Sequence, residues 1–333
     1  MTGITVGVKK LIARVDRFQR THGWAGVPVA VAKKFGEDKA GQLAALVAYY
    51  AFFSLFPLML ALVTIVGLVF EGDAGLQERV IGSALAQFPV LGDRIRQNIG
   101  ELGGSFVALA VGLAGALWAG LGGIKVAQNA MDQIWDVPIK RQPNFLLALV
   151  RAILMLATLG MFVALSTFLG GVAAGTEQAS PILQAVGIAG SFALNFLVFL
   201  VGFKVLTVAN VRWRDILPGA LVASVLWSAL QALGGYIIGH RLESASETYG
   251  FFAVVIGLLT WLYLGSQITL LAAEVNVVRT KRLWPRSLDP EDLTEADRRT
   301  LRELAEVEER REDQRVDVSF RDDPADAPIG RRR

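Results

Sequence analysis

The stretch LAALVAYYAFFSLFPLMLALVTIVGLVF, from Leu43 to Phe70, contains no charged residue. At about 1.5 Å per residue, a helix of this length covers about 42 Å, which exceeds the roughly 30 Å hydrocarbon thickness of a bilayer. The stretch therefore predicts a membrane-spanning helix that tilts or bends. Pro57 marks the place for a bend, because proline has no backbone N–H to complete the helical hydrogen bonding.

One face of this predicted helix is small and hydroxylated. On a 3.6-residue period it carries Tyr50, Ser54 and Pro57. We expect this face to point into a helix bundle. Two interpretations stay open: close packing against a neighbouring helix, which is the commoner role of such a face, and the wall of a transport pathway.

The composition excludes an ordinary soluble domain. Of the 333 residues, 53% are hydrophobic and 19% are charged, which is typical of an integral membrane protein. The formal charge of +3 reflects basic termini and short loops, so we expect no nucleic-acid partner. With no cysteine, and with His22 and His240 far apart in the sequence, we expect neither a metal site nor a cofactor.

Apolar runs beyond the first one predict an all-α bundle of six transmembrane helices. The loops alternate between basic and non-basic, which places both termini in the cytoplasm and the segment 71–104, read as amphipathic, at the outer surface. The predicted spans cover about 43–70, 105–124, 145–170, 183–206, 216–239 and 250–275. The polar connection 125–144 is predicted to lie between the second and third spans.

The two ends of the chain differ from the transmembrane domain, which we assign to residues 37–280. Residues 1–36 are predicted to form a basic amphipathic segment on the cytoplasmic leaflet. Residues 281–333 read as a charged cytoplasmic tail, partly helical and then disordered, which would be solvated or bind a cytoplasmic protein. The sequence says nothing of the oligomeric state.

Two later spans also carry polar stripes. Ser224, Ser228 and Gln231 share one face of the fifth span, and Tyr263 and Gln267 share one face of the sixth. Polar groups are costly against lipid, so these faces should point inward. Hydrogen-bonded packing and a transport pathway are both compatible with the pattern.

A predicted inner charge cluster follows from helix lengths. Counting along parallel spans brings Lys125, Lys204 and Glu274 to the same cytoplasmic depth, where Asp38 begins the first span. One interpretation is that both lysines extend to lipid headgroups while Glu274 meets water. The alternative hypothesis pairs Glu274 with Lys204 or Lys125 as a gate at the inner mouth of the bundle.

Three motifs, in this order, resemble the YihY/BrkB family of bacterial inner-membrane proteins. They are AALVAYYAFFSLFPL, AQNAMDQIWDV and YGFFAVVIGLLTWLYLGSQITLLAAEVN, and the similarity spans about residues 35–280. Ala272 stands where the family pattern has glycine. The resemblance implies a six-helix inner-membrane protein, associated in some members with serum resistance or envelope-lipid transport.

Older members of that family carry a ribonuclease label, which the residues do not favour. Phosphodiester hydrolysis needs a metal cluster, or positioned acids and bases beside a phosphate-binding surface, and neither is recognisable here. We therefore expect no enzyme. The sequence favours a permease of flippase type for a lipid-like envelope substrate, with a non-transporting membrane scaffold as the alternative; membrane lipids are the expected partners.

Overall fold

The computed structural model describes residues 13–69, 75, 106–141, 146–151, 153–155, 158, 161–162, 165, 181–207, 211–289 and 292–320. Within these residues the chain is helical, without a strand, which confirms the all-α prediction. Residues 1–12, nearly all of the segment 71–104 and the end of the tail, 321–333, lie outside the description. Predictions made for them stay predictions.

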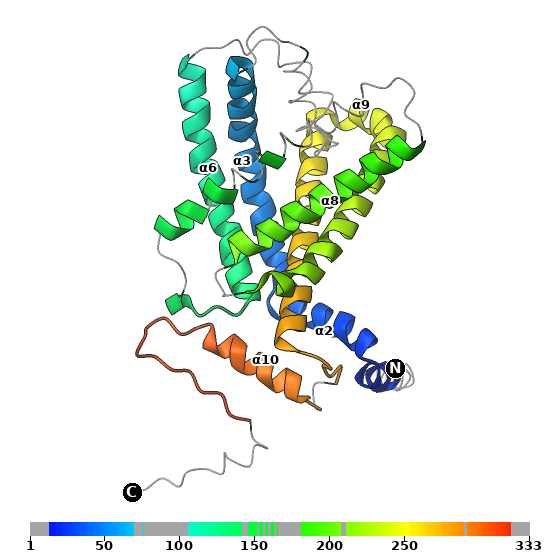
Figure 1. Cartoon of the computed structure of the whole chain (residues 1–333), viewed down its shortest axis with the longest axis vertical. Helices are drawn as coiled ribbons and strands as arrows, with labels where there is room; N and C mark the ends of the chain where they lie inside the picture. Colours follow the sequence, from blue (N-terminus) through cyan, green and yellow to red (C-terminus); the bar gives the residue numbers. More distant parts are fainter. Residues whose placement is uncertain are drawn as a thin grey trace, which may run out of the picture.

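The main helices are α2 (Gly23–Glu37), α3 (Ala40–Val69), α6 (Phe106–Ile134), α8 (Pro181–Leu206), α9 (Trp213–Lys281) and α10 (Glu295–Glu306), with a short 3-10 turn at Ile139–Arg141. Two of the long helices, α3 and α6, lie side by side along the vertical axis of Figure 1, α8 runs obliquely across the bundle, and the shorter helices α2 and α10 lie across its lower end. The predicted first and fourth spans correspond to α3 and α8.

The second helix is longer than the sequence predicted. The span expected at 105–124 continues as α6 to Ile134, through residues interpreted as a polar connection. The prediction missed that Ala130, Met131 and Ile134 form a buried apolar face here, and that no proline interrupts the chain before Pro138. The extra turns carry the chain to the end of the bundle.

The 69 residues of α9 are one helical element that folds back on itself (Figure 1). Its first arm, Trp213–Gly234, and its second arm, Val255–Lys281, are each long and apolar enough to cross a membrane. The arms lie against each other, because the rings of Trp227 and Trp261 are 6.2 Å apart in an edge-to-face arrangement. They correspond to the predicted fifth and sixth spans.

Three described helical stretches are long and apolar enough to cross a membrane: the two arms of α9 and Val186–Leu206 of α8. Shorter apolar helices cover Ala40–Leu55 and Leu146–Met155, the latter within the predicted third span. The chain is thus an integral membrane protein by composition and by helix length. The count of six spans and the orientation of the termini remain predictions.

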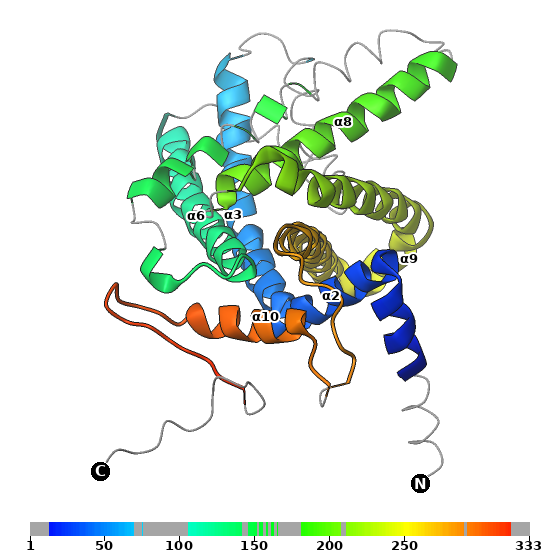
Figure 2. The same cartoon turned by 60° about the horizontal axis from the view of Figure 1, so that its bottom comes forward.

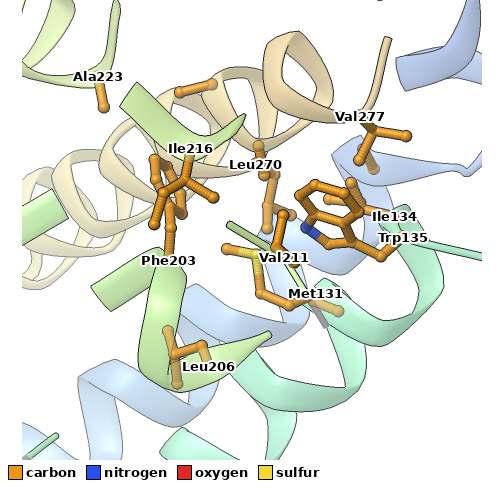
Figure 3. Close-up of a cluster of buried hydrophobic side chains, with 14 of the residues drawn as sticks. Met131, Ile134, Trp135, Phe203, Leu206, Val211, Ile216, Ala223, Leu270 and Val277 are labelled. Carbon is orange, nitrogen blue, oxygen red and sulfur yellow. The ribbon is translucent and has the colours of Figure 1, made fainter. Parts of the chain in front are cut away.

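The apolar core gathers where α3, α6, α8 and α9 converge. Figure 3 shows Trp135 and Met131 of the α6 end facing Leu270 and Val277 of α9, with Phe203 of α8 beside them. These side chains are almost completely buried. Their close packing fixes the lower end of the bundle, on which the polar residues described below are mounted.

The backbones of the two arms of α9 approach closely at Gly219. A Cβ atom there would lie 2.2 Å from the Ala272 carbonyl oxygen and 2.4 Å from Asn276 Nδ2. The backbone N–H of Gly219 instead donates to Asn276 Oδ1 at 2.6 Å. The small residue Ala272 on the second arm is thus matched by a glycine on the facing arm.

Gly219→Ala should therefore lower the free energy of unfolding by about 1–3 kcal/mol, because the added methyl group forces the arms apart. Gly190→Ala in α8 is the matched control, since a Cβ there meets nothing within 4 Å. Alanine also forms helix better than glycine, so the control should be neutral or slightly stabilising. Unfolding in denaturant measures both; equal losses would contradict the close approach.

The helices α2 and α10, from opposite ends of the sequence, lie at the same end of the bundle (Figures 1 and 2). Ala30 and Val31 of α2 are buried against Val278 of α9. The segment predicted to lie on the leaflet thus packs on protein over residues 23–37. The tail helix α10 also packs on protein rather than standing solvated, with Ala296 and Thr300 buried.

Candidate functional site

A buried charge cluster, formed by Lys34, Asp38, Asp136, Glu274 and Lys281, lies at the end of the bundle where α2, α6 and α9 meet. Lys34 Nζ donates to Asp38 Oδ2 at 2.6 Å and to Asp136 Oδ1 at 3.2 Å. All three side chains are at most 1% exposed. Lys34 sits on the last turn of α2, one helical turn before Asp38, and Asp136 follows α6.

Lys281 joins the cluster to α10. Its Nζ donates to Asp136 Oδ2 at 2.8 Å and to Glu303 Oε2 at 2.9 Å, and also to the Trp135 carbonyl at 3.1 Å. Asp136 therefore lies between two lysines, one on α2 and one on α9. Because such charged hydrogen bonds are the stronger kind, they tie four separate elements together at one point.

Glu274 completes the cluster from the second arm of α9 and is fully buried. Its carboxyl group faces Asp38 and lies close to Lys34 and Asp136. Both Glu274 carboxyl oxygens and Asp38 Oδ1 meet no hydrogen-bond donor. Buried acceptors are almost always satisfied, so this contact between two carboxyl groups is chemically unusual.

The electrostatics of the cluster follow from an excess of acid. Burial alone would lower the pKa of Lys34, but the attraction of Glu274, Asp136 and Asp38 raises it. Burial raises the pKa of Asp38, and this effect exceeds the lowering caused by Lys34. Lys34 is therefore held charged, whereas burial, with a smaller contribution from Asp136, disfavours an ionised Asp38.

A second set of ion pairs, the Arg286 network, fastens the tail to α2. Arg286 is fully buried; its Nη2 donates to both Glu37 carboxyl oxygens at 2.7 Å, and its Nε donates to Asp297 Oδ1 at 2.6 Å. Lys33 Nζ reaches the same Asp297 oxygen at 2.7 Å. Although burial alone would raise the pKa of Asp297, bonds from Arg286 and Lys33 lower it below its ordinary value.

The structure brings together only half of the predicted inner charge cluster. Asp38 and Glu274 meet, but Lys125 is exposed, and Lys204 donates to the Val211 carbonyl with its Nζ 5.8 Å from the centre of the Trp213 ring. Neither lysine pairs with Glu274 in this structure. The cation that does approach Glu274 is Lys34, which the sequence analysis placed on the lipid surface.

The small face of α3 packs against α6. Ser54 Oγ donates to the Tyr50 carbonyl at 2.7 Å, and a Cβ at Gly123 would lie 3.2 Å from that Oγ. The Tyr50 ring contacts the position of Gly122. Of the two interpretations of this face, helix packing describes Tyr50 and Ser54. The side chain of Pro57 lies outside the description, although its backbone is helical within α3.

The polar stripes of α9 contain one fully buried residue and several half-buried ones. Ser224 is fully buried and donates to the Ala220 carbonyl at 2.7 Å, within its own arm. Tyr263 is half-buried against the apolar core near Phe35. The remaining stripe residues, Ser228, Gln231 and Gln267, are also half-buried.

Sequence reasoning missed Lys34, Asp136, Lys281 and Arg286. A signal existed for the first, because Lys34 and Asp38 are spaced to face each other across one helical turn. For Asp136 the signal was weaker: it is the only residue of the IWDV segment that carries a charge. Among the described residues no group of histidine, cysteine and acidic side chains is arranged to hold a metal ion.

Comparison with known proteins matches the chain to one protein family and to several bacterial relatives. A family profile described as "Virulence factor BrkB" matches residues 31–295. YfkH of Bacillus subtilis, ribonuclease-like by name, is 24% identical over 261 residues, covering 74% of this chain and 91% of its own length. A UPF0761 membrane protein of Alkalilimnicola ehrlichii is 27% identical over 256 residues, 74% of this chain and 56% of the relative.

The inner membrane protein YhjD of Escherichia coli is 22% identical over 267 residues, covering 74% of this chain and 78% of its own. No solved structure matches the chain. The matched family region, residues 31–295, includes every member of the buried charge cluster and ends at the start of α10.

Proposed function

Because the chain belongs to the BrkB family of bacterial membrane proteins, we propose that it is a flippase-type permease of the inner membrane for an amphipathic envelope lipid. The resemblance inferred from the sequence motifs is thereby confirmed. The relatives are named as membrane proteins, one of them as an inner membrane protein. Transport and its substrate class are the proposal.

The observation that carries the proposal is the buried charge cluster. Removing charges from water costs several kcal/mol per ion, and pairing offsets this only in part, so a bundle held for stability alone would gain from apolar replacements. Ionisable side chains in membrane bundles are concentrated on substrate and ion pathways. Ion pairs between α2, α6 and α9 can also break and reform, which suits a gate.

An amphipathic substrate matches the surroundings of the cluster. Lys34 and Lys281 supply positive charge for an acidic or zwitterionic headgroup at the end of the bundle. On α3, which begins next to Asp38, Tyr49 and Phe53 are exposed and form an aromatic surface along which acyl chains can lie. Polar and apolar contacts for one lipid are therefore adjacent.

The test is lipid movement in vesicles that contain the purified full-length protein. Fluorescent phospholipid in the outer leaflet should become protected from a membrane-impermeant quencher faster than in protein-free vesicles. Matched vesicles with Lys34→Met protein should lose this activity, and those with the exposed-site variant Lys125→Met should keep it. Folded wild-type protein that moves neither zwitterionic nor acidic lipids would contradict the proposal.

The scaffold alternative is favoured by one observation, the charged outer face of α10, which carries Glu295 and Arg299 in exposed positions. Removing the whole tail from Arg286 cannot separate the alternatives, because Arg286 and Glu303 hold both ion-pair networks. Charge reversal of the exposed Glu295 and Arg299 is cleaner. A scaffold should lose its partner and phenotype, whereas a permease should keep lipid movement in vesicles.

Hydrolysis of a phosphodiester is not part of the proposal, despite the name of the relative YfkH. Lysines engage Asp38 Oδ2 and both oxygens of Asp136. In the part of the chain that the structure describes, no group of histidine and acidic side chains is arranged to bind the divalent ion that such chemistry commonly uses. We propose that the chain is not an enzyme.

A further inference from the structure

We propose that Asp38 and Glu274 form a proton-binding site in which the two carboxyl groups share one proton. Their carboxyl groups lie close together inside the bundle, with Asp38 1% and Glu274 0% exposed, and three of their four oxygens meet no hydrogen-bond donor. An ionised carboxylate only accepts hydrogen bonds, so two ionised groups cannot bond to each other. The contact is satisfied when one of them is protonated.

The positions of the oxygens identify the proton's place. Asp38 Oδ2 already accepts the hydrogen bond from Lys34 at 2.6 Å, which leaves Oδ1 as the free acceptor. Glu274 meets no donor at either oxygen. A proton on Glu274, donated to Asp38 Oδ1, therefore satisfies both buried groups at once. Uptake converts one carboxylate to a carboxylic acid and needs no other reactant.

The other charged groups around the pair also indicate that the pair binds one proton. From α2 comes Lys34, from the end of α6 the buried Asp132 and Asp136, and from α9 and α10 the pair Lys281 and Glu303. Within the buried charge cluster, two lysines, Lys34 and Lys281, balance two of the three carboxylates Asp38, Asp136 and Glu274. At least one negative charge is therefore left over unless a proton neutralises it.

This site would couple proton release to opening of the gate. Protonated, the pair holds the second arm of α9 against the turn before α3; once ionised, the two carboxylates repel, and Lys34 can balance only one of them. The coupling role rests on the proposed permease function. Proton binding itself is measured without transport, so either proposal can fail while the other stands.

The test compares two neutralising changes in the same cluster, using purified full-length protein in detergent. The folded state should bind one proton more than the unfolded state, so raising the pH through the mildly acidic range should increase the unfolding equilibrium constant about tenfold per pH unit until the proton is lost. Glu274→Gln should abolish this dependence without loss of stability at neutral pH. Asp136→Asn should keep the dependence and be destabilised throughout.

Infrared spectroscopy supplies a second readout, and Asp38→Asn a second variant should Glu274→Gln fail to fold. The wild-type protein should show the carbonyl stretch of a buried carboxylic acid, which either substitution removes and Asp136→Asn retains. The proposal is overturned if the wild-type protein shows neither the pH dependence nor the band, or if both persist in Glu274→Gln and Asp38→Asn.

Discussion

Replacing Lys34 with methionine should lower the free energy of unfolding by about 3–5 kcal/mol, the cost expected when one partner of a buried ion pair is removed. The methionine fills a similar volume, so the loss is electrostatic rather than a cavity effect. Asp38 would lose its hydrogen bond of 2.6 Å and Asp136 one of its two lysines, while Glu274 would lose its nearest cation.

Lys125→Met provides the control, because that lysine is exposed and should change stability by no more than about 0.5 kcal/mol. Denaturant unfolding in detergent, followed by tryptophan fluorescence, measures both variants. The double variant Lys34→Met with Glu274→Gln should recover part of the loss, because it removes one of the uncompensated carboxylates. Equal stability of Lys34→Met and wild type would contradict the assignment of Lys34 as the central cation.

Replacing Arg286 with methionine should have an effect of similar size, about 3–5 kcal/mol, because it leaves Asp297 buried without its closest cation. Arg286 makes a forked contact to both oxygens of Glu37 and a further bond to Asp297 at 2.6 Å. Arg286→Lys should restore little of the loss, since an ammonium group cannot reproduce the planar fork. Arg279→Met, at an exposed position on α9, is the control.

The same network predicts how stability changes in acid. The pKa of Asp297 in the folded protein lies below the 3.8 of an ordinary aspartate, so its stabilising contribution is complete above that pH and is lost as the pH falls through the folded value. Arg286→Met should therefore lose less stability than wild type as the pH falls. If unfolding at several pH values shows the same loss in both proteins, other carboxylates cause it.

How far the sequence predicts this structure differs between the bundle and its polar end. The long apolar runs locate α3, α8 and both arms of α9, because burial in lipid needs about twenty apolar residues and leaves a plain signal. Helix α6 was predicted too short, since its last turns bury Met131 and Ile134 among polar neighbours. The helix thus combines the predicted second span with an end that packs on protein.

The cluster illustrates what helix counting can and cannot supply. Counting residues gives the depth of a side chain, and it put Asp38, Lys125, Lys204 and Glu274 at one level. Depth does not give the direction in which a side chain points, so counting left open whether the two lysines reach lipid headgroups or Glu274. In the structure Lys125 is exposed and Lys204 donates to the Val211 carbonyl. The bond from Lys34 to Asp136 joins residues 102 positions apart, which no local pattern records.

The packing of the tail, too, could not be predicted from a local sequence pattern. The charged tail has few apolar residues, and the sequence therefore predicted that it would be solvated or bind a cytoplasmic protein. Within the described residues, its helix α10 is held by buried ion pairs, in which Asp297 bonds to Arg286 and Lys33. The packing of the tail depends on complementary charges in two segments from opposite ends of the chain. Each segment alone has the sequence of a hydrophilic surface.

Lipid movement by the Asp38→Asn variant tests most directly whether the buried charge cluster is a working part of the protein or only holds it together. Asparagine can still accept the hydrogen bond from Lys34, and Glu274 remains to balance the charge of that lysine, so the variant should stay folded at neutral pH. The account predicts that this folded variant no longer moves fluorescent phospholipid across vesicle membranes. Full lipid movement by stable Asp38→Asn protein, beside active wild type, would contradict it.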